Sequence, residues 1–349
     1  MAKRGDVKVV VAGCGGMANS WVRLTKAAPR TQIVGLVDVR REAAEAMAGR
    51  HDLPGDIVYP TLKAALKSAK PDAVFDVTIP AAHGPVTLEA LRGGCHVLGE
   101  KPMSDSLPMA RRMVAAAKRA GKLYAVTQTR RPLPKMMSIQ KFLKGGAIGP
   151  VEEAHCDFYI GAHFGGFRDE MADVLLVDMA IHTFDQARML TGADPVAVYC
   201  HSFNPKRSWY KGDASAVAIF EMRTPKGDVV FSYRGSWCAE GLNTSWECAW
   251  RIIGRKGTLT WDGREGIQAA AVDPKGKHAF TSQMVDVPVA PVTMDYTGHE
   301  YLIRDFLDCV RTGGRRKPMC PCEDNIKSLA MVLAAVKSAH SGKREKVVW

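Results

Sequence analysis

The sequence reads Val9-Val-Val-Ala-Gly13-Cys-Gly15-Gly-Met-Ala18 near its start, and the fold prediction begins from these residues. The β-branched run is typical of a strand buried on both faces, and the glycines that follow fit G-x-G-x-x-A at a strand-to-helix turn. Gly13 permits the tight turn, Gly15 lets the backbone approach a pyrophosphate, and Ala18 lets helix and strand pack closely. We therefore predict a dinucleotide site that includes Gly13, Gly15, Gly16, Met17 and Ala18.

An acidic residue stands where such a site needs one. Asp38 lies at the end of the next predicted strand, Ile33–Val39, 20 residues after Ala18. A carboxylate there can accept hydrogen bonds from the adenosine ribose, and it would repel the 2′-phosphate of NADP. This favours NAD. Arg40 and Arg41 follow, however, and their guanidinium groups could hold that phosphate, so NADP stays possible; they could equally be solvated residues at a helix start.

Strand and helix patterns alternate outward from this motif. Apolar runs predict strands, and amphipathic segments with Gly or Pro at their ends predict helices. The predicted strands are 8–12, 33–39, 73–79, 96–99 and 123–127, and the predicted helices are 61–70, 85–92 and 109–120. Alternation of this kind indicates an α/β fold with a doubly wound parallel sheet, which we assign to a first domain of residues 1–127.

The pattern changes in the remainder of the chain. Short turn sequences, such as Thr224-Pro-Lys-Gly227 and Gly254-Arg-Lys-Gly257, join β-rich segments and favour antiparallel neighbours. One helix is predicted at Val174–Leu190 and a closing helix at about 324–340. Residues 128–349 are therefore predicted to form an α+β domain on a large, mainly antiparallel sheet.

Three further segments, taken with the glycine loop, resemble those of a known family. Thr78-Ile-Pro80-Ala-Ala-His83 closes one predicted strand and Gly99-Glu100-Lys101-Pro102 closes the next. Val177-Asp178-Met-Ala-Ile-His182-Thr-Phe-Asp185 lies on the predicted helix of the second domain. Over nearly its whole length the chain resembles the Gfo/Idh/MocA oxidoreductases, the family of glucose-fructose oxidoreductase and inositol dehydrogenase. Ala180 stands where that family usually has Gly.

This resemblance implies a function as well as a fold. It implies an NAD(P)-binding Rossmann domain and oxidation of a hydroxyl of a sugar, sugar acid or cyclitol, or the reverse reduction. It implies that Lys101 contacts the reacting hydroxyl, that His182 is the general acid/base, and that Asp178 orients or binds substrate. The cofactor-contacting set then extends to Asp38, Arg40, Thr78, Pro80, His83, Glu100 and Lys101. It also implies a homodimer or homotetramer formed through the C-terminal sheet.

The residue types support these roles independently. Asp178 and His182 are four apart, which places them on one face of an α-helix. Histidine titrates near operating pH and can accept the hydroxyl proton, and a cationic Lys101 would stabilise alkoxide character. A histidine on such a helix can also be structural, and the pair could bind a metal. No further ligands are identifiable, so we predict no metal.

Substrate-binding candidates come from two regions. The glycine-rich loop Gly161-Ala-His-Phe-Gly-Gly-Phe-Arg168 precedes the predicted catalytic helix, and it makes His163 and Arg168 candidates beside Asp178 and His182. Trp237 could stack on a sugar ring, although an aromatic residue in a strand is more often part of the core.

Two other functions remain possible on this fold. One is a redox-neutral NAD-dependent glycosidase or lyase, which takes a hydride and returns it. The other is a non-catalytic NAD(P)-sensing protein, which would not need both Lys101 and His182.

Composition restricts the partners. The 349 residues carry 48 Lys+Arg against 36 Asp+Glu, a formal charge of +12 that favours acidic partners. The basic pairs are dispersed along the chain, and no nucleic-acid-binding motif is recognised, so we predict no nucleic-acid partner. No apolar run approaches the ~20 residues that span a bilayer, and we predict no membrane partner. The nine scattered cysteines, with only Cys320-Pro-Cys322 close together, indicate reduced thiols in a cytoplasmic protein.

Overall fold

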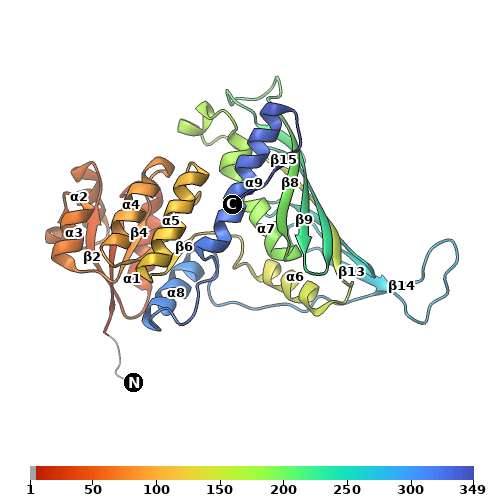
Figure 1. Ribbon diagram of the computed structural model, residues 1–349, viewed down its shortest axis with the longest axis horizontal. Helices are drawn as coiled ribbons and strands as arrows, with labels where there is room; N and C mark the ends of the chain where they lie inside the picture. The colour runs from red at the N-terminus through yellow and green to blue at the C-terminus, as the bar shows by residue number, and fades with distance from the viewer. Residues whose placement is uncertain (1–4) are drawn as a thin grey trace. The chain divides into compact units, whose positions relative to one another are not determined.

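The computed structural model describes residues 5–349 and contains two compact units (Figure 1). The first unit comprises the chain up to Thr129 together with Tyr296–Leu329. The second comprises Arg130–Asp295 together with Ala330–Trp349. Each unit has its own sheet, and the two are described separately below.

A six-stranded sheet forms the centre of the first unit, and all of its strand pairs are parallel. Its spatial order is β3-β2-β1-β4-β5-β6. The strands are β1 (Val7–Ala12), β2 (Thr31–Val37), β3 (Val58–Tyr59), β4 (Ala73–Asp76), β5 (His96–Gly99) and β6 (Tyr124–Val126). The predicted doubly wound parallel sheet is thus confirmed. Its order reverses between β1 and β4, and ligands of such sheets bind beside the carboxyl ends of the strands at this point.

Helices connect these strands, and short-range sequence signals set several of their ends. They are α1 (Gly16–Ala27), α2 (Arg41–Arg50), α3 (Leu62–Ala69), α4 (Pro80–Arg92) and α5 (Leu107–Ala120), with a 3₁₀ turn η1 at Gly55–Ile57. Thr61 caps α3 by accepting a hydrogen bond from the Ala64 amide at 3.1 Å. Gly121 ends α5 in the left-handed conformation, as a C-terminal glycine typically does.

The chain returns to the first unit late in the sequence, which differs from the predicted boundary at residue 127. Helix α8 (Gly298–Arg311) buries Ile303, Phe306, Leu307 and Val310 in the same core as the residues of β1 and β4. Phe306 packs edge-on against Phe75 with ring centroids 6.1 Å apart. Assigning all of residues 128–349 to one domain is therefore wrong for Tyr296–Leu329, because the apolar face of α8 completes the first core.

The second unit is built on a nine-stranded, mostly antiparallel sheet, as predicted. Its order is β14-β13-β12-β11-β7-β10-β9-β8-β15, with β7 and β10 parallel. The strands are β7 (Val151–Tyr159), β8 (Asp194–Phe203), β9 (Ser215–Thr224), β10 (Gly227–Ser236), β11 (Ala249–Gly254), β12 (Gly257–Trp261), β13 (Ile267–Val272), β14 (Met284–Asp286) and β15 (Glu345–Lys346). Both predicted turns join antiparallel neighbours, with Thr224 opposite Gly227 and Gly254 opposite Gly257.

The two faces of this sheet differ. On one face Phe220 and Phe231 pack against Phe184 of helix α7 (Ile181–Thr191), with ring centroids 4.7 and 6.1 Å away. Helix α6 (Pro134–Gly145) contacts α7, and α9 (Cys322–Ser341) starts in the first unit and ends in this one. On the other face the side chains of Tyr199, Val217, Ile219 and Val230 are exposed. One face is thus core and the other is open.

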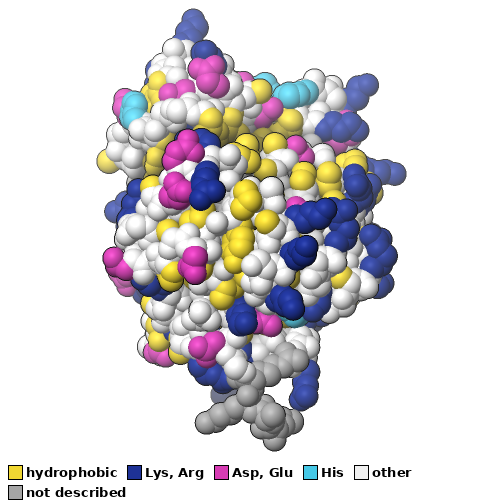
Figure 2. Space-filling view, turned by 90° about the vertical axis from the view of Figure 1, so that its left-hand side faces the viewer, with side chains coloured by type: hydrophobic (Ala, Val, Ile, Leu, Met, Phe, Trp, Pro, Cys, Tyr) yellow, Lys and Arg dark blue, Asp and Glu magenta, His cyan; other side chains and the backbone are white. Residues whose placement is uncertain are grey.

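Much of the positive charge of the first unit lies on one layer of helices. Lys and Arg side chains gather along one side of the face shown in Figure 2. Helices α3, α4 and α5 pack side by side and expose Lys63, Lys67, Arg92, Arg111, Arg112, Lys118 and Arg119. Glu89 is the only acidic residue within these three helices. The fold therefore brings together basic residues that the sequence separates.

Among residues 5–349, no helix has the length and apolar character needed to cross a bilayer.

Candidate functional site

The glycine loop leaves the start of α1 open. Gly15 is the N-cap of α1, no side chain caps it, and the first turn contains no acidic residue. A Cβ atom at Gly15 or Gly16 would meet nothing within 4 Å. Gly13 has φ +91°, and a Cβ there would lie 2.5 Å from the Val77 carbonyl oxygen. Gly13 is therefore required by the turn itself, and the amides at the start of α1 are accessible to an anion such as a pyrophosphate.

Asp38 is held in a defined orientation next to this loop. Its Oδ2 accepts a hydrogen bond from the Cys14 amide at 2.8 Å, and its Oδ1 accepts one from the Arg40 amide at 2.9 Å. Each carboxylate oxygen has two lone pairs, so each can still accept a ribose hydroxyl. The Arg40 residue forms the N-cap of α2, and its side chain is exposed.

Three exposed apolar side chains follow strand ends at the same edge of the sheet. Met17, Val39 and Ile79 are 52%, 102% and 69% exposed, and they follow β1, β2 and β4. Large apolar side chains beside the phosphate loop can contact the faces of a nucleoside. The sequence predicts Met17 as a site residue but not Val39 or Ile79. The sequence signal that could have identified Val39 and Ile79 is their position shortly after the ends of β2 and β4.

The predicted residues Thr78 and His83 cluster around a buried carboxylate. Asp76 is fully buried at the end of β4. Its Oδ1 lies 2.5 Å from Thr78 Oγ1 and 3.0 Å from His83 Nδ1, and its Oδ2 accepts a hydrogen bond from Thr87 at 3.1 Å. Pro80 begins helix α4 between them. This network fixes the turn between β4 and α4. The other ring nitrogen of His83, Nε2, is buried and has no hydrogen-bond partner within residues 5–349.

Glu100 and Lys101 directly follow β5, at the same edge of the sheet as the glycine loop. The Lys101–Pro102 peptide is cis, and Lys101 is half-buried. The carboxylate of Glu100 is 11% exposed and accepts hydrogen bonds from other parts of the unit.

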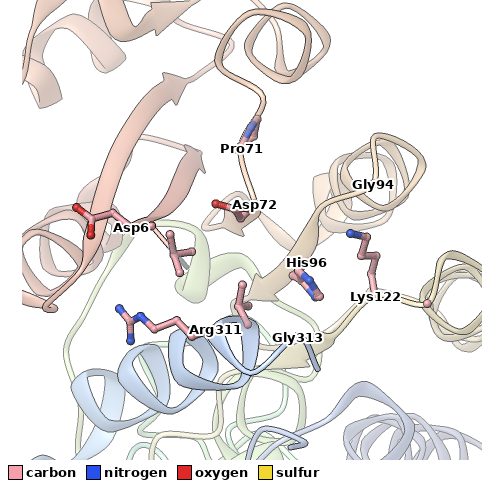
Figure 3. A pocket seen from close by; sticks show the side chains of 12 residues that line it. Asp6, Pro71, Asp72, Gly94, His96, Lys122, Arg311 and Gly313 are labelled. Carbon is pink, nitrogen blue, oxygen red and sulfur yellow. The ribbon is translucent and has the colours of Figure 1, made fainter. Parts of the chain in front are cut away.

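A cavity of about 500 Å³ lies at the opposite edge of this sheet (Figure 3). Its polar lining comes from Asp6, Asp72, His96 and Lys122, which precede or begin strands, and from Arg311 at the end of α8. Asp72 already accepts a hydrogen bond from the Lys8 amide, and Arg311 donates to Asp308 and to Thr31. Because it lies at the amino ends of the strands, it is not the dinucleotide site.

In the second unit, Asp178 and His182 lie on two different kinds of helix. The sequence predicts one helix over Val174–Leu190. The structure has a π-helix, η3 (Leu175–Ala180), followed by α7. Asp178 lies in the π-helix and His182 in the first turn of α7, so the four-residue spacing crosses their junction. π-Helical turns occur frequently at functional sites, because they shift side chains out of the α-helical register.

The predicted loop residue Arg168 contacts Asp178 directly. Arg168 lies in the 3₁₀ turn η2 (Gly166–Glu170), and its Nε donates a hydrogen bond to Asp178 Oδ2 at 2.6 Å. Its guanidinium carbon lies 5.2 Å from the ring centre of Phe164 and 4.7 Å from that of Phe167. The structure thus brings Arg168 and Asp178 together, with aromatic faces on the guanidinium group.

His163 and Trp237 belong to neighbouring aromatic contacts. His163 stacks on Trp209 at 3.6 Å between ring centres, and its Nε2 lies 3.2 Å from Glu240. Trp237 is 1% exposed and packs against Phe164 at 5.9 Å. Its indole Nε1 is buried and has no hydrogen-bond partner within residues 5–349. Trp237 is therefore a buried support for the exposed Phe164.

Trp246 is a candidate that the sequence does not reveal. It is 44% exposed and packs against Phe164 with ring centres 6.1 Å apart.

The acidic residue Asp185, which follows His182 in the motif, pairs with Arg131 through two hydrogen bonds of 2.6 and 2.7 Å. This pair is buried, so Asp185 holds α7 in place.

Cysteine and metal-ligand geometry adds no further site. All nine cysteines are buried. Within residues 5–349, no three His, Cys, Asp or Glu side chains gather in a group that could hold a metal ion.

Comparison with known proteins concerns both sheets of the chain. Residues 7–128 match the model of an oxidoreductase family with an NAD-binding Rossmann fold, and residues 136–260 match the GFO/IDH/MocA C-terminal domain. The D-apiose dehydrogenase of Paraburkholderia graminis is 25% identical over 96% of this chain and 88% of its own length. The 1,5-anhydro-D-fructose reductase of Ensifer adhaerens is 23% identical over 96% and 97%. An oxidoreductase structure from Agrobacterium radiobacter superimposes with a TM-score of 0.83 at 20% identity, covering 98% of each chain.

Proposed function

The chain belongs to the Gfo/Idh/MocA oxidoreductases and has an NAD-binding Rossmann domain, and from this we propose that it oxidises a hydroxyl of a sugar, sugar acid or cyclitol. The reverse reduction of the ketone uses the same groups. The observation that carries the proposal is the charged Arg168–Asp178 contact beside the aromatic side chains Phe164 and Trp246. A polyhydroxylated ring needs hydrogen-bonding groups at its edge and an apolar surface at its face.

The proposed mechanism assigns one proton and one charge to this chain's residues. NAD held by the glycine loop and Asp38 would supply the acceptor for the hydride that leaves the carbinol carbon. His182 accepts the hydroxyl proton, and loss of this proton together with the hydride converts the alcohol to a ketone. Lys101 stabilises the negative charge that develops on the oxygen, and Asp178 accepts a hydrogen bond from a neighbouring hydroxyl. The half-buried positions of Lys101, Asp178 and His182 support these roles.

NAD is the proposed physiological cofactor. Phosphate binding at the open start of α1 is supported by the exposed space over Gly15 and Gly16. Within residues 5–349, Asp38 accepts hydrogen bonds from the backbone amides of Cys14 and Arg40, so its charge is available to bind a ribose and to repel a 2′-phosphate. NADP remains the alternative, with the exposed Arg40 as the group to bind its phosphate.

The sugar or polyol class draws support from relatives. Two of them, which align over 96% of this chain, are named as a D-apiose dehydrogenase and a 1,5-anhydro-D-fructose reductase. Both names describe redox chemistry on a sugar or sugar derivative. We propose the same class here.

We also propose that the protein is a cytoplasmic homodimer or homotetramer. The open face of the second sheet carries Tyr199, Val217, Ile219 and Val230, and burying such side chains against a second copy is favourable. The nine cysteines are an odd number and all of them are buried, which supports a reducing compartment.

A substrate panel tests the proposal. Purified protein is incubated with NAD and, separately, each of a set of sugars, sugar acids and inositols, and NADH absorbance is followed. Net NADH formation with at least one compound is expected. Conversion of a compound without lasting NADH would instead assign redox-neutral chemistry, and binding of NAD without any conversion would assign a sensor.

A further inference from the structure

The carboxylate of Glu100 accepts hydrogen bonds from three other segments of the first unit and from the backbone amide of the next residue, Lys101. Its Oε1 accepts hydrogen bonds from Trp21 Nε1 at 2.8 Å and from His299 Nε2 at 2.7 Å. Its Oε2 accepts hydrogen bonds from Thr127 Oγ1 at 3.1 Å and from the Lys101 backbone amide at 3.1 Å. One carboxylate thus links α1, α8 and the residue after β6 to the backbone of the proposed catalytic lysine.

These contacts keep the carboxylate ionised. Burial alone raises the pKa of Glu100, but the hydrogen bond and charge of His299, the hydrogen bond of Trp21 and the charge of Lys101 lower it to about 2. An ionised carboxylate only accepts hydrogen bonds, so Nε2 of His299 must carry the proton of their contact. Both oxygens therefore act as acceptors for fixed donors.

The donors on Oε1 are themselves immobilised by packing. Trp21 is fully buried and packs edge-on against Phe75 at 5.4 Å and against His299 at 5.8 Å. His299 lies in the first turn of α8, which is anchored in the core through Ile303 and Phe306. Side chains held this firmly can position a partner within the tolerance that catalysis needs.

We infer that His299 and Trp21 orient Glu100, and that Glu100 in turn fixes the backbone of Lys101 for the reaction. Glu100 and His299 are then positioning residues, and this inference rests on the proposed role of Lys101. The resemblance placed Glu100 among the cofactor contacts, whereas both of its oxygens are used in holding the strand end. His299 lies 199 residues after Glu100 in sequence, so the lysine's geometry depends on a segment that follows most of the second unit.

Three variants test the inference. Glu100→Gln replaces one acceptor oxygen by an amide NH₂ group. This NH₂ group is itself a donor, so at least one of the donors that face Glu100 loses its acceptor. His299→Leu removes a donor, whereas His299→Gln can restore one at a similar position. We expect kcat to fall about 10- to 100-fold in Glu100→Gln and His299→Leu, with the KM for NAD little changed, and to recover largely in His299→Gln.

Glu300→Gln is the matched control. It removes a carboxylate next to His299 on the same helix, where Glu300 pairs with Arg304 at 2.9 Å. Its kcat should equal that of the wild type. A loss as large as that of Glu100→Gln would assign the effect to general disturbance of α8 and overturn the inference.

Hydrogen exchange at the Lys101 amide provides a readout that does not depend on turnover. Exchange in a peptide covering 99–106 should accelerate in Glu100→Gln and His299→Leu and return towards wild type in His299→Gln. Unchanged exchange, or unchanged kcat in both variants, would overturn the inference. Should His299→Leu fail to fold, the kcat and the exchange rates of Glu100→Gln and His299→Gln still test the inference. If Lys101→Ala keeps wild-type turnover while exchange responds as expected, the proposed function fails and the structural coupling stands.

Discussion

The guanidinium group of Arg168 donates a hydrogen bond from Nε to Oδ2 of Asp178 over 2.6 Å, and this contact ties the loop 161–168 to the π-helix η3. The Asp178 side chain is 12% exposed and that of Arg168 is 30% exposed. A charge-assisted hydrogen bond in such a place fixes the direction of a carboxylate that is proposed to bind substrate.

Replacing Arg168 by Gln should lower kcat/KM by roughly one to two orders of magnitude, since a hydrogen bond to a charged group is worth about 1.5–3 kcal/mol. Most of the effect should appear in the KM for the sugar. Steady-state kinetics at fixed NAD measures it. Arg255→Gln is the control, because Arg255 makes a similar ion pair with Glu152 in an exposed turn. Equal kinetics for wild type and Arg168→Gln would remove Arg168 from the substrate site.

Cofactor preference should depend on the charge of Asp38. Asp38→Asn keeps the side-chain shape and one acceptor oxygen, but it removes the negative charge that repels a 2′-phosphate. The ratio of kcat/KM for NADP to that for NAD should rise about tenfold or more. Asp56→Asn, at an exposed carboxylate of η1, should leave the ratio unchanged. A ratio unaffected by Asp38→Asn would show that this carboxylate does not face the ribose.

The acid stability of the fold should carry a contribution from Glu100. Its pKa falls from an ordinary 4.5 to about 2 in the folded state, so the stabilisation is complete above about pH 4.5 and is lost as pH falls towards 2. The full contribution is roughly 3 kcal/mol. The free energy of unfolding of the wild type should therefore decrease more steeply below pH 4.5 than that of Glu100→Gln. Urea unfolding at a series of pH values measures both, and parallel curves would contradict the role of this carboxylate.

Self-association should depend on the open face of the second sheet. Ile219 of β9 is 48% exposed and lies opposite Tyr199 of β8. Ile219→Arg would place a charge in an apolar interface and should reduce the solution mass to that of one chain, as measured by light scattering. Phe280→Arg changes an equally apolar, fully exposed side chain outside the named strands and should have no effect. A monomeric wild type, or an unchanged mass in Ile219→Arg, would contradict the proposed interface.

The conformation of the glycine loop and its flanking strands could be predicted because its signals are local. Gly13, Gly15 and Asp38 lie within one strand-turn-helix-strand unit, where backbone sterics and strand ends determine both structure and chemistry. The proposal of Arg168 as a substrate-binding residue also rests on a short separation in sequence, since Arg168 precedes Asp178 by ten residues.

The remaining features depend on contacts between distant segments. The return of Tyr296–Leu329 to the first unit follows from the apolar face of α8, which a sequence pattern shows without showing what it packs against. The contact between His299 and Glu100 has no local signal at all. The π-helix at Asp178 differs from an α-helix in that each hydrogen bond spans one residue more. The spacing of apolar residues in the sequence does not distinguish the two kinds of helix.

The kcat of Lys101→Ala and of His182→Ala, measured on the compound that the panel identifies, tests the central claim most directly. Each variant should lose at least about 100-fold in kcat while its dissociation constant for NAD, measured by calorimetry, stays close to that of the wild type. That result would assign the two residues to the chemical step. Near wild-type turnover in either variant would contradict the account.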